Sequence, residues 1–254
     1  MIKDFAAIVL AAGKGTRLAS GAPSPKPKVL YKLAGQPMIS YTLDLLRGLG
    51  MEEVVVVVGH QAEKVRKTVG KDFKVVHQDK RLGTGHAVKI GLAQVAKEEK
   101  EILVLNGDDS AFYKVETVWK VLKKHIGKGN TVTFVSLEPA NPRGLGRVVR
   151  DGENVLRIVE EKDAGSKEKK IKEVNDGLYV FRRDWLEKNL PKLKKSPVGE
   201  YYLVDLVELA VNQGKKVSAY KLEDPSQWLG VNTPEELKKA DSFMRTRLSN
   251  ASKK

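Results

Sequence analysis

The sequence predicts an α/β fold: a Rossmann-like, mostly parallel sheet flanked by helices, with a smaller mixed lobe attached. Two patterns carry this prediction. Up to about residue 110, short apolar runs alternate with segments of helical periodicity, which is typical of a parallel sheet covered on both faces. After residue 110, several strand-like runs follow one another with fewer helices between them. Because 254 residues with 41% hydrophobic composition can bury one sizeable core, we expect a single domain over residues 1–254.

The first half, about residues 1–110, alternates strands and helices. The expected strands are Ala6–Ala11, Val54–Val58, Lys74–His77 and Ile102–Leu105, and the expected helices are Ser40–Gly48, Ala62–Val69 and Gly85–Lys97. Each strand runs into a loop at its carboxyl end. In open α/β sheets ligands bind at that edge, so motifs in these loops are candidate site residues.

The second half, about residues 111–232, contains the expected mixed lobe. Its strands are predicted at Thr131–Leu137, Gly146–Arg150, Val155–Glu160, Val174–Phe181 and Val217–Lys221, and its helices at Val115–Ile126 and Tyr201–Gln213. Residues 163–172 are polar and without apolar periodicity, so we expect a flexible surface excursion there.

A last helix is expected over about residues 233–248. Thr233 suits its N-cap, Pro234 its first position, and Glu235 and Glu236 its first turn. The tail from Ser249 to Lys254 is expected to fray.

Composition excludes several classes of function. The chain contains no cysteine, which rules out disulfides, a thiol nucleophile and cysteine-bound zinc and favours a cytoplasmic location. No segment has the pattern of a targeting signal or a membrane span. The net charge of +14 suits nucleic acid, an anionic membrane or small phosphorylated substrates. Because the lysine clusters lack interleaved aromatic residues, we expect no nucleic-acid partner.

A glycine-rich loop follows the first predicted strand. Its sequence is Leu10-Ala11-Ala12-Gly13-Lys14-Gly15-Thr16-Arg17. Small residues let the backbone approach a ligand, and consecutive amide groups can cradle phosphate oxygens. The spacing fits neither a Walker loop nor the dinucleotide-binding pattern. Taken by itself, the loop leaves open the alternative of a glycine-rich turn without a ligand.

The loop together with Pro27-Lys28-Val29-Leu30 resembles the opening motifs of the sugar nucleotidyltransferase superfamily. This resemblance implies that Leu10, Ala11, Ala12, Gly13 and Gly15 contact a nucleotide. It also implies catalytic roles for Arg17 at the departing pyrophosphate and for Lys28 at the reacting phosphates. Such cations fit the chemistry, because phosphoryl-type transfer depends on positioning and on offsetting negative charge. Lys26 is a rival to Lys28, but the register with Val29-Leu30 favours Lys28.

A second block, Gln78 with Leu82-Gly83-Thr84-Gly85-His86-Ala87, is similar to the uridylyltransferase members of that family, above all the bacterial N-acetylglucosamine-1-phosphate type. The resemblance implies that Gln78, Gly83 and Thr84 bind the nucleotide and that the amide of Gln78 reads uracil. An amide has one donor and one acceptor group, which suits the imide edge of that base. We expect His86 to be a structural helix residue.

Further motifs imply a sugar site in the second half. Gly144-Leu145-Gly146-Arg147, Val159-Glu160-Glu161-Lys162-Asp163 and Glu173-Val174-Asn175-Asp176-Gly177 resemble family elements through which Gly146, Glu160 and Asn175 bind the sugar. Each residue also has a simpler interpretation. Glu160 suits a surface ion pair with Lys162, and Gly146 suits a bend.

Asp108 and Asn232 are implied by the resemblance to bind Mg²⁺, which is therefore the expected cofactor. A carboxylate and an amide oxygen, completed by phosphate oxygens and water, are ligands that this ion accepts. The chain departs from the family next to this site, because Asp109-Ser110-Ala111 replaces a usual apolar and proline-containing continuation. The extra carboxylate of Asp109 leaves open a change in metal or nucleotide use.

The resemblance implies an enzyme that transfers a nucleotidyl group, specifically uridylyl, from an NTP to a sugar 1-phosphate and releases pyrophosphate. N-acetylglucosamine 1-phosphate is the first expected acceptor, with glucose 1-phosphate and UTP or dTTP as the alternative pair. A non-catalytic sugar-nucleotide sensor is a second alternative. The expected partners are small molecules, and a homo-oligomer stays open. No general base is expected, because a phosphate monoester is largely dianionic at neutral pH.

Overall fold

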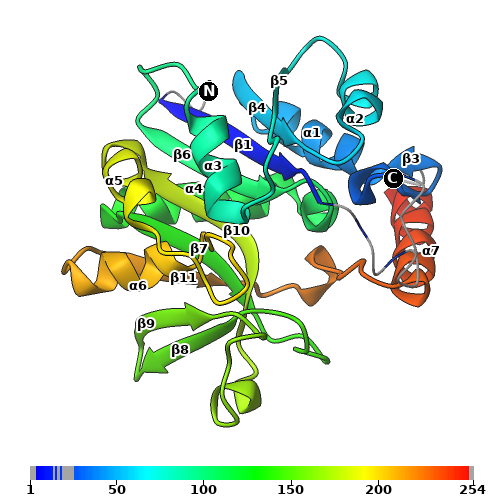
Figure 1. Cartoon of the computed structure of the whole chain (residues 1–254). Coiled ribbons are helices and arrows are strands. Elements are labelled where there is room, and N and C mark those ends of the chain that lie inside the picture. The colour runs from blue at the N-terminus through cyan, green and yellow to red at the C-terminus, as the bar shows by residue number, and fades with distance from the viewer. Residues whose placement is uncertain (1–3, 14, 16–17, 19–25, 252–254) are drawn as a thin grey trace.

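The computed structural model describes residues 4–13, 15, 18 and 26–251. Its main sheet has the strand order β11-β7-β10-β6-β1-β4-β5, with the hairpin β8–β9 attached through β10 (Figure 1). Strand β10 runs antiparallel to β6 and β7, whereas the other neighbours along this path are parallel. The predicted α/β class with a mostly parallel sheet is confirmed. The strands are β1 (Phe5–Ala11), β4 (Glu53–Val58), β5 (Lys74–His77), β6 (Glu101–Asn106), β7 (Val132–Leu137), β8 (Arg147–Asp151), β9 (Asn154–Val159), β10 (Val174–Arg182) and β11 (Val217–Lys221).

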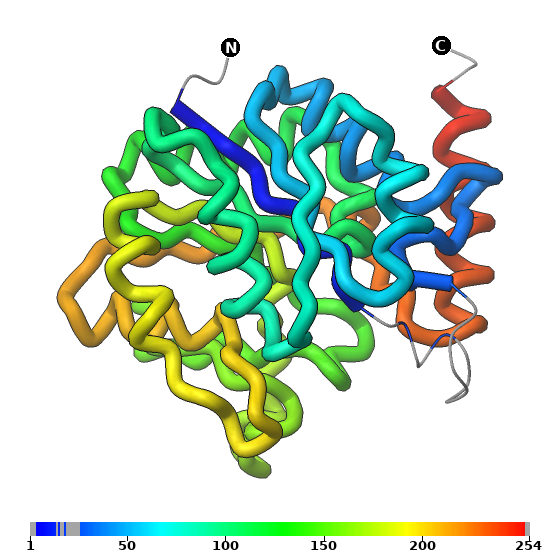
Figure 2. The backbone as a smooth tube through the Cα atoms, turned by 45° about the horizontal axis from the view of Figure 1, so that its top comes forward, coloured from blue at the N-terminus to red at the C-terminus, as the bar shows by residue number. Residues whose placement is uncertain are grey.

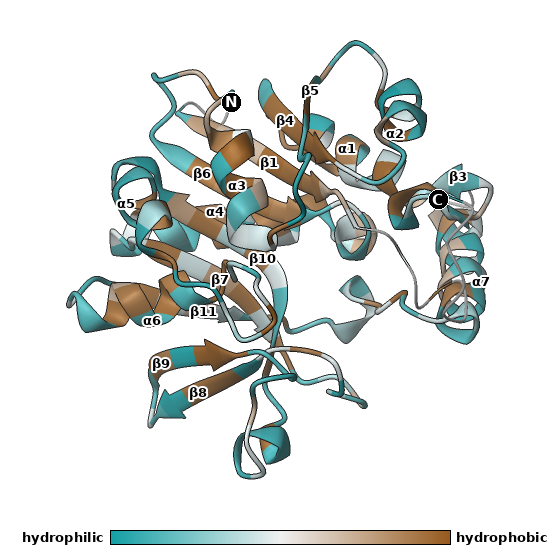
Figure 3. Ribbon diagram, viewed as in Figure 1, coloured by the Kyte–Doolittle hydropathy of each residue, from teal (hydrophilic) through white to brown (hydrophobic). Residues whose placement is uncertain are grey.

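The two faces of the sheet bury separate apolar clusters. Along β1, Ala7 and Val9 belong to one cluster, whereas Ala6 and Ile8 belong to the other, because successive side chains of a strand point to opposite faces. Figure 3 shows the apolar strands between helices whose outer surfaces are polar. The first face is covered by α1 (Met38–Gly48), α2 (Ala62–Val69) and α4 (Val115–Lys128), and the second by α3 (Thr84–Leu92), α5 (Arg183–Asn189) and α6 (Asp205–Asn212).

A third apolar cluster joins the C-terminal helix to earlier segments. Helix α7 (Pro234–Ala251) buries Ala240 and Met244 against a group that includes Leu33, Met38 and Phe112. Leu33 belongs to a short hairpin of β2 (Lys32–Leu33) and β3 (Gln36–Pro37). In Figure 2 the red helix lies beside the blue N-terminal segment that contains this hairpin.

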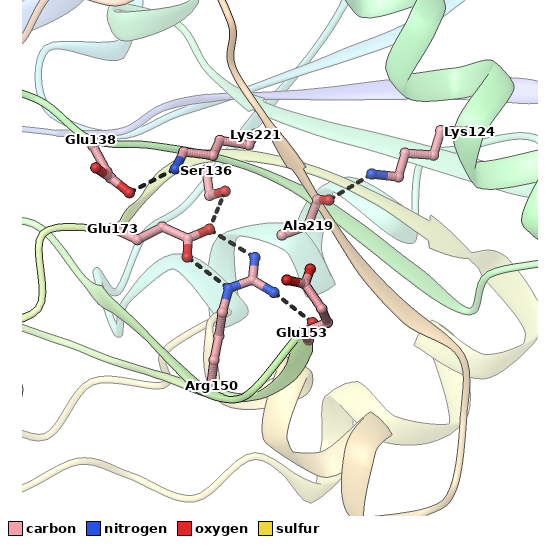
Figure 4. Close-up of polar contacts among 8 residues, drawn as sticks. All are labelled: Lys124, Ser136, Glu138, Arg150, Glu153, Glu173, Ala219 and Lys221. Atoms are coloured by element: carbon pink, nitrogen blue, oxygen red, sulfur yellow. Dashed lines mark hydrogen bonds and ion pairs between the residues drawn. The ribbon is translucent and has the colours of Figure 1, made fainter.

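An ion-pair network ties the β8–β9 hairpin to the main sheet (Figure 4). The guanidinium of Arg150 on β8 donates to both carboxylate oxygens of Glu173, at 2.7 and 2.8 Å. Ser136 on β7 donates to the same carboxylate at 2.6 Å. Glu173 directly precedes Val174 and Asn175 on β10, so the network holds the start of that strand against the hairpin.

Several predicted boundaries were wrong. Helix α3 ends at Leu92 rather than Lys97, and the following segment is held by long-range contacts, among them Ala96 N donating to Glu53 Oε1 at 3.1 Å. Helix α6 begins at Asp205 rather than at Tyr201, because the backbone of Tyr201 is bonded to Leu82 and Gly85. Helix α7 continues through Ala251, so its last turn is not frayed from Ser249 on.

The sequence patterns also missed short elements. Helix α5 and the β2–β3 hairpin were not predicted. The excursion at 163–172 is not entirely loose, because it contains the 3-10 helix Glu168–Lys170 and Arg157 donates to Glu168 Oε1 at 2.9 Å. Among the described residues, no helix combines the length and the apolar character that a bilayer crossing requires.

Candidate active site

A pocket of about 710 Å³ lies where the carboxyl ends of β1 and β6 meet the second half of the chain. It gathers almost every site residue that the motifs implied. In the first half of the chain these are Leu10, Ala11, Ala12, Gly13, Lys28, Gln78, Gly83, Thr84 and Asp108, and in the second half Gly146, Glu160, Asn175 and Asn232. Arg17 lies outside the described residues. Gly15 is described but does not line this pocket.

The glycine-rich loop forms one wall of the pocket. Ala11 is the last residue of β1, and Ala12 and Gly13 continue from it without regular structure. Gly15 has φ +68°, and a side chain there would come within 3.0 Å of Lys28 Cβ. Glycine is therefore needed at this position so that the loop can pass close to Lys28.

The side chain of Lys28 lies between the two residues assigned to the metal. Its ammonium group forms an ion pair with Asp108 and donates to Asn232 Oδ1 at 3.0 Å. Asp109 Oδ1 lies 3.7 Å from the same nitrogen. Lys26, the rival lysine, is placed elsewhere, with its nitrogen 4.4 Å from the centre of the Tyr31 ring.

This arrangement also tests whether Mg²⁺ fits. A cation, the Lys28 ammonium, already bridges Asp108 and Asn232, so their oxygens converge on one point. Within the described part of the chain, no group of three or more acidic or histidine side chains is arranged to hold a metal. Two protein oxygens and several from phosphate and water are a usual set for Mg²⁺. The residues present therefore fit Mg²⁺ bound together with a phosphorylated substrate.

The start of α7 fixes the position of Asn232. Glu236 Oε2 accepts hydrogen bonds from the backbone N–H of Asn232 at 2.7 Å and of Thr233 at 3.2 Å, while Thr233 Oγ1 accepts from Glu236 N at 3.2 Å. This reciprocal pattern is a capping box. The capping box at the predicted N-cap Thr233 has a second effect, because its Glu236 carboxylate holds the backbone of Asn232 beside Lys28.

Gln78 follows β5 and is only 3% exposed. Its Nε2 donates to the carbonyl oxygen of Gly83 at 3.2 Å and faces His86 Nδ1 at 3.0 Å. Thr84 lines the pocket as the first residue of α3, and its Oγ1 accepts from Leu203 N at 3.0 Å. His86, which was expected to be a structural helix residue, does not line the pocket. Its ring nevertheless contacts the side chain of Gln78, the residue expected to read the nucleobase.

The three residues expected to bind the sugar lie close together in the pocket lining. Asn175 N donates to the carbonyl oxygen of Gly146 at 2.9 Å, and a side chain on Gly146 would come within 2.9 Å of Ile158. Burial, and then the nearby carboxylate of Asp205, raises the pKa of Glu160. Arg147, which is 1% exposed, pairs with Glu161 at 2.6 Å and donates to the Leu145 carbonyl, so it holds the loops on both sides of this part of the lining.

The motifs did not single out two pocket residues, Tyr179 and Asp176. Tyr179 on β10 is 2% exposed, and burial followed by the Glu160 carboxylate raises the pKa of its hydroxyl well above the usual value. Burial likewise raises the pKa of Asp176 well above its usual value, against the opposing hydrogen bond from Leu178 N. A tyrosine inside a strand pattern is indistinguishable from a core residue in the sequence. The only signal for Asp176 was its place between Asn175 and Gly177.

A second cavity, of about 680 Å³, lies at the opposite edge of the sheet, beside the start of β6. Several of its polar groups bond to one another or to neighbouring side chains. His125 faces Thr133 Oγ1 at 2.9 Å and Glu101 Oε2 at 3.0 Å, and Arg183 donates to Glu187 at 2.8 Å. The motif residues and the carboxyl edge of the strands both favour the first pocket as the functional site.

Cationic, amide and carboxylate groups at the carboxyl edge of a mostly parallel sheet define the class of this molecule, an α/β protein with a pocket suited to a phosphate-bearing nucleotide. The sequence profile of the nucleotidyl transferase family matches residues 6–247. The chain belongs to this family, and the resemblance of its motifs is confirmed.

Individual relatives agree with this assignment. The chain is 41% identical over 245 residues to the "Bifunctional protein GlmU" of Alkaliphilus oremlandii, covering 96% of this chain and 52% of that protein. It is 38% identical over 248 residues to the protein of the same name from Clostridioides difficile, covering 97% of this chain and 53% of that protein. The chain therefore spans about half the length of these relatives.

A solved structure shares the fold. The crystal structure of a "Putative Glucose-1-Phosphate Thymidylyltransferase" from Bacillus anthracis in complex with a sucrose matches with a TM-score of 0.80. The match covers 95% of each chain at 19% sequence identity. At this identity the likeness concerns the fold alone.

Proposed function

We propose that this chain, acting as one nucleotidyltransferase domain, transfers the uridylyl group of UTP to a sugar 1-phosphate and releases pyrophosphate. N-acetylglucosamine 1-phosphate is the acceptor that we favour, and the cysteine-free composition suits a reaction in the cytoplasm. One observation carries the proposal. A single pocket joins Gln78, a lysine ammonium bound to Asp108 and Asn232, and the polar wall of Gly146, Glu160 and Asn175.

The proposed reaction is a displacement at the α-phosphorus. An oxygen of the sugar 1-phosphate forms a bond to that phosphorus, and the bond to the β-phosphate oxygen breaks with its electron pair leaving on pyrophosphate. Lys28 offsets charge on the approaching phosphates, and Arg17 is proposed to do so at the leaving group. Bound Mg²⁺ would be held by Asp108 and Asn232 and would supply further charge compensation.

The polar wall is proposed to hold the sugar. The burial that raises the pKa of Glu160 also makes its carboxylate a strong acceptor for a sugar hydroxyl or an acyl amide. Asn175 offers an amide group beside it. Binding the sugar here would place its 1-phosphate toward Lys28, since both walls belong to one pocket.

Glucose 1-phosphate with UTP or dTTP is the second candidate pair. Uracil and thymine present the same imide edge to Gln78, so this residue does not separate the two bases. A non-catalytic sensor is the contrasting proposal. It requires that the pocket bind a nucleotide without turnover.

Pyrophosphate release in the presence of Mg²⁺ tests the proposal. UTP, dTTP, CTP, ATP and GTP are each combined with N-acetylglucosamine 1-phosphate and with glucose 1-phosphate. We expect the fastest release with UTP and N-acetylglucosamine 1-phosphate. Binding of nucleotide without release for any pair would replace this proposal with the sensor, and preferred use of glucose 1-phosphate would replace the acceptor.

A further inference from the structure

Two neighbouring groups determine how the side-chain amide of Gln78 is oriented. The carbonyl oxygen of Gly83 lies 3.2 Å from Nε2, and His86 Nδ1 lies 3.0 Å from the same nitrogen. A carbonyl oxygen can only accept, so the amide must turn its NH₂ group toward Gly83. The same NH₂ group then supplies its second hydrogen to His86, whose Nδ1 accepts while the ring proton resides on Nε2. Both donors of the Gln78 side chain are thereby used inside the protein.

The partners of Gln78 are themselves held in place. Tyr201 N donates to the Leu82 carbonyl at 2.7 Å, and Gly85 N donates to the Tyr201 carbonyl at 2.9 Å. Gly83 has φ +94°, and a side chain there would lie 2.5 Å from the Tyr201 carbonyl oxygen. The Leu82–Gly85 segment is therefore clamped against Tyr201, and the Gly83 carbonyl is fixed in its direction toward Gln78.

The Gln78 side chain therefore has only an acceptor, Oε1, left to offer a ligand. Gln78 lines the pocket and is 3% exposed, and its Oε1 accepts no hydrogen bond from the described residues. The N–H of Gly83 likewise donates to none of the described residues. The pocket lining thus includes one acceptor, on Gln78, and one backbone donor, on Gly83, that no described residue uses. Uracil and thymine present N3–H next to a carbonyl oxygen, which matches this pair, whereas cytosine presents an unprotonated N3 that would face Oε1.

We propose that His86 is a positioning residue that sets the pyrimidine preference of the site. By accepting the second hydrogen of the Gln78 NH₂ group, it reinforces the orientation that the Gly83 carbonyl sets, so that Oε1 faces the base and imide pyrimidines are preferred to cytosine. This inference rests on the proposed function, since it assumes that the pocket binds a nucleoside triphosphate. It differs from the expectation that Gln78 offers a base both a donor and an acceptor.

Two substitutions at His86 separate the hydrogen bond from the packing of the ring. His86→Phe keeps an aromatic ring without an acceptor, and His86→Asn places an amide oxygen near the position of Nδ1. His77→Phe is the matched control, because His77 is an exposed histidine whose ring faces Asp79 and Gly59 rather than Gln78. Thermal unfolding of each variant checks that the fold is retained.

The readout is the ratio of affinities for UTP and CTP, measured by calorimetry with Mg²⁺, and the ratio of the two kcat/KM values. We expect His86→Phe to lower the UTP/CTP ratio about tenfold, because the amide is then held by the Gly83 carbonyl alone, and turning an N–H toward cytosine N3 gives up one hydrogen bond instead of two. His86→Asn and His77→Phe should stay within about threefold of the unmodified chain. An unchanged ratio in His86→Phe, an equal loss in His86→Asn, or tighter binding of CTP than UTP to the unmodified chain would each overturn the inference.

The same experiment separates this inference from the proposed function. Selective UTP binding that depends on His86 in a chain without turnover would support the inference and remove the proposed reaction. Turnover of UTP with a ratio that does not depend on His86 would support the reaction and remove the inference.

Discussion

The Lys28 ammonium lies within bonding range of three oxygen-bearing side chains, and two of these are the proposed metal ligands. In the structure it forms an ion pair with Asp108 and a hydrogen bond of 3.0 Å with Asn232. Binding of Mg²⁺ to those oxygens would require the ammonium to move off them and toward the phosphates. Substitution of Lys28 therefore tests the proposed chemistry directly.

We predict that Lys28→Ala lowers kcat about 10²- to 10³-fold, because a cation that offsets charge in the transition state is lost. Asp108→Ala should lower it at least as much. Pyrophosphate release is the measurement, with the melting temperature as a check of the fold. Lys26→Ala is the matched control and should retain the normal rate, because its ammonium lies over the Tyr31 ring. Near-normal turnover of Lys28→Ala would remove this residue from the mechanism.

Asp205 gives a pH-dependent prediction at the same scale. Burial, with help from Glu208 and Asp163, raises the pKa of Asp205 from 3.8 to about 6. The folded chain therefore takes up a proton between pH 6 and 4 that the unfolded chain does not, and stability contributed by this group rises as the pH falls through that window. Asp205→Asn should remove this dependence of stability on pH. The free energy of unfolding of the variant, relative to that of the unmodified chain, should be higher by about 1 to 3 kcal/mol more at pH 7.5 than at pH 4.

Urea unfolding at the two pH values measures this difference. Asp151→Asn serves as the control, because Asp151 is exposed at the end of β8. An equal effect of Asp205→Asn at both pH values would show that this carboxyl titrates alike in the folded and unfolded chain.

At the scale of elements, the first turn of α7 connects helix capping to the site. Glu236→Ala removes the acceptor for the backbone N–H groups of Asn232 and Thr233. We expect a loss of about 1 kcal/mol in the free energy of unfolding. We also expect a higher Mg²⁺ concentration for half-maximal rate, because Asn232 loses its fixed position. Glu235→Ala, which removes an exposed carboxylate of the same turn, should change neither quantity. Equal Mg²⁺ dependence in the two variants would contradict this link.

The hairpin network gives a second prediction for elements. Burial raises the pKa of Glu173, but the hydrogen bonds from Arg150 and Ser136 outweigh it, so the pKa lies below its usual value. Its contribution to stability is complete above pH 4.5 and is lost as the pH falls through the folded pKa. Glu173→Gln should cost about 1 to 3 kcal/mol at pH 7 and progressively less below pH 4.5.

Chemical unfolding at several pH values measures this loss. Glu153→Gln is the control, because Arg150 bonds to the backbone carbonyl of Glu153 and not to its carboxylate (Figure 4). A loss of stability in Glu173→Gln that does not change with pH would point to packing rather than to the ion pair.

At the scale of the whole molecule, helix α7 closes the third cluster and so joins the two ends of the chain. Met244 is 2% exposed among residues from the first 120 positions, from the segment just before α7 and from α7 itself. Met244→Ala should lower the free energy of unfolding by about 2 to 5 kcal/mol, since it leaves a cavity in this cluster. Urea unfolding measures the change, and Lys239→Ala on the exposed side of the same helix should leave it unaltered. A loss below about 1 kcal/mol would mean that the cluster closes around the gap.

The sequence by itself determined most of the regular elements, though not α5 or the β2–β3 hairpin, and it determined the site motifs. Runs such as Val54–Val58 are strands because β-branched residues pack well in a sheet buried on both faces, and the capping pattern at Thr233 is local in the chain. The pocket residues could be predicted because their motifs resemble those of a known family, and several of these motifs follow strands at the ligand-binding edge of the sheet. Their assigned roles stay predictions.

The tertiary structure decided what depends on distant partners. Lys28 meets Asn232 across 204 positions, and Tyr201 leaves the predicted helix because its backbone bonds to the Leu82–Gly85 segment. The contact of Gln78 with His86, on which the proposed base preference depends, has no pattern of its own in the sequence. Periodicity and local motifs describe neighbours along the chain, whereas these contacts exist only once the sheet has brought its loops to one edge.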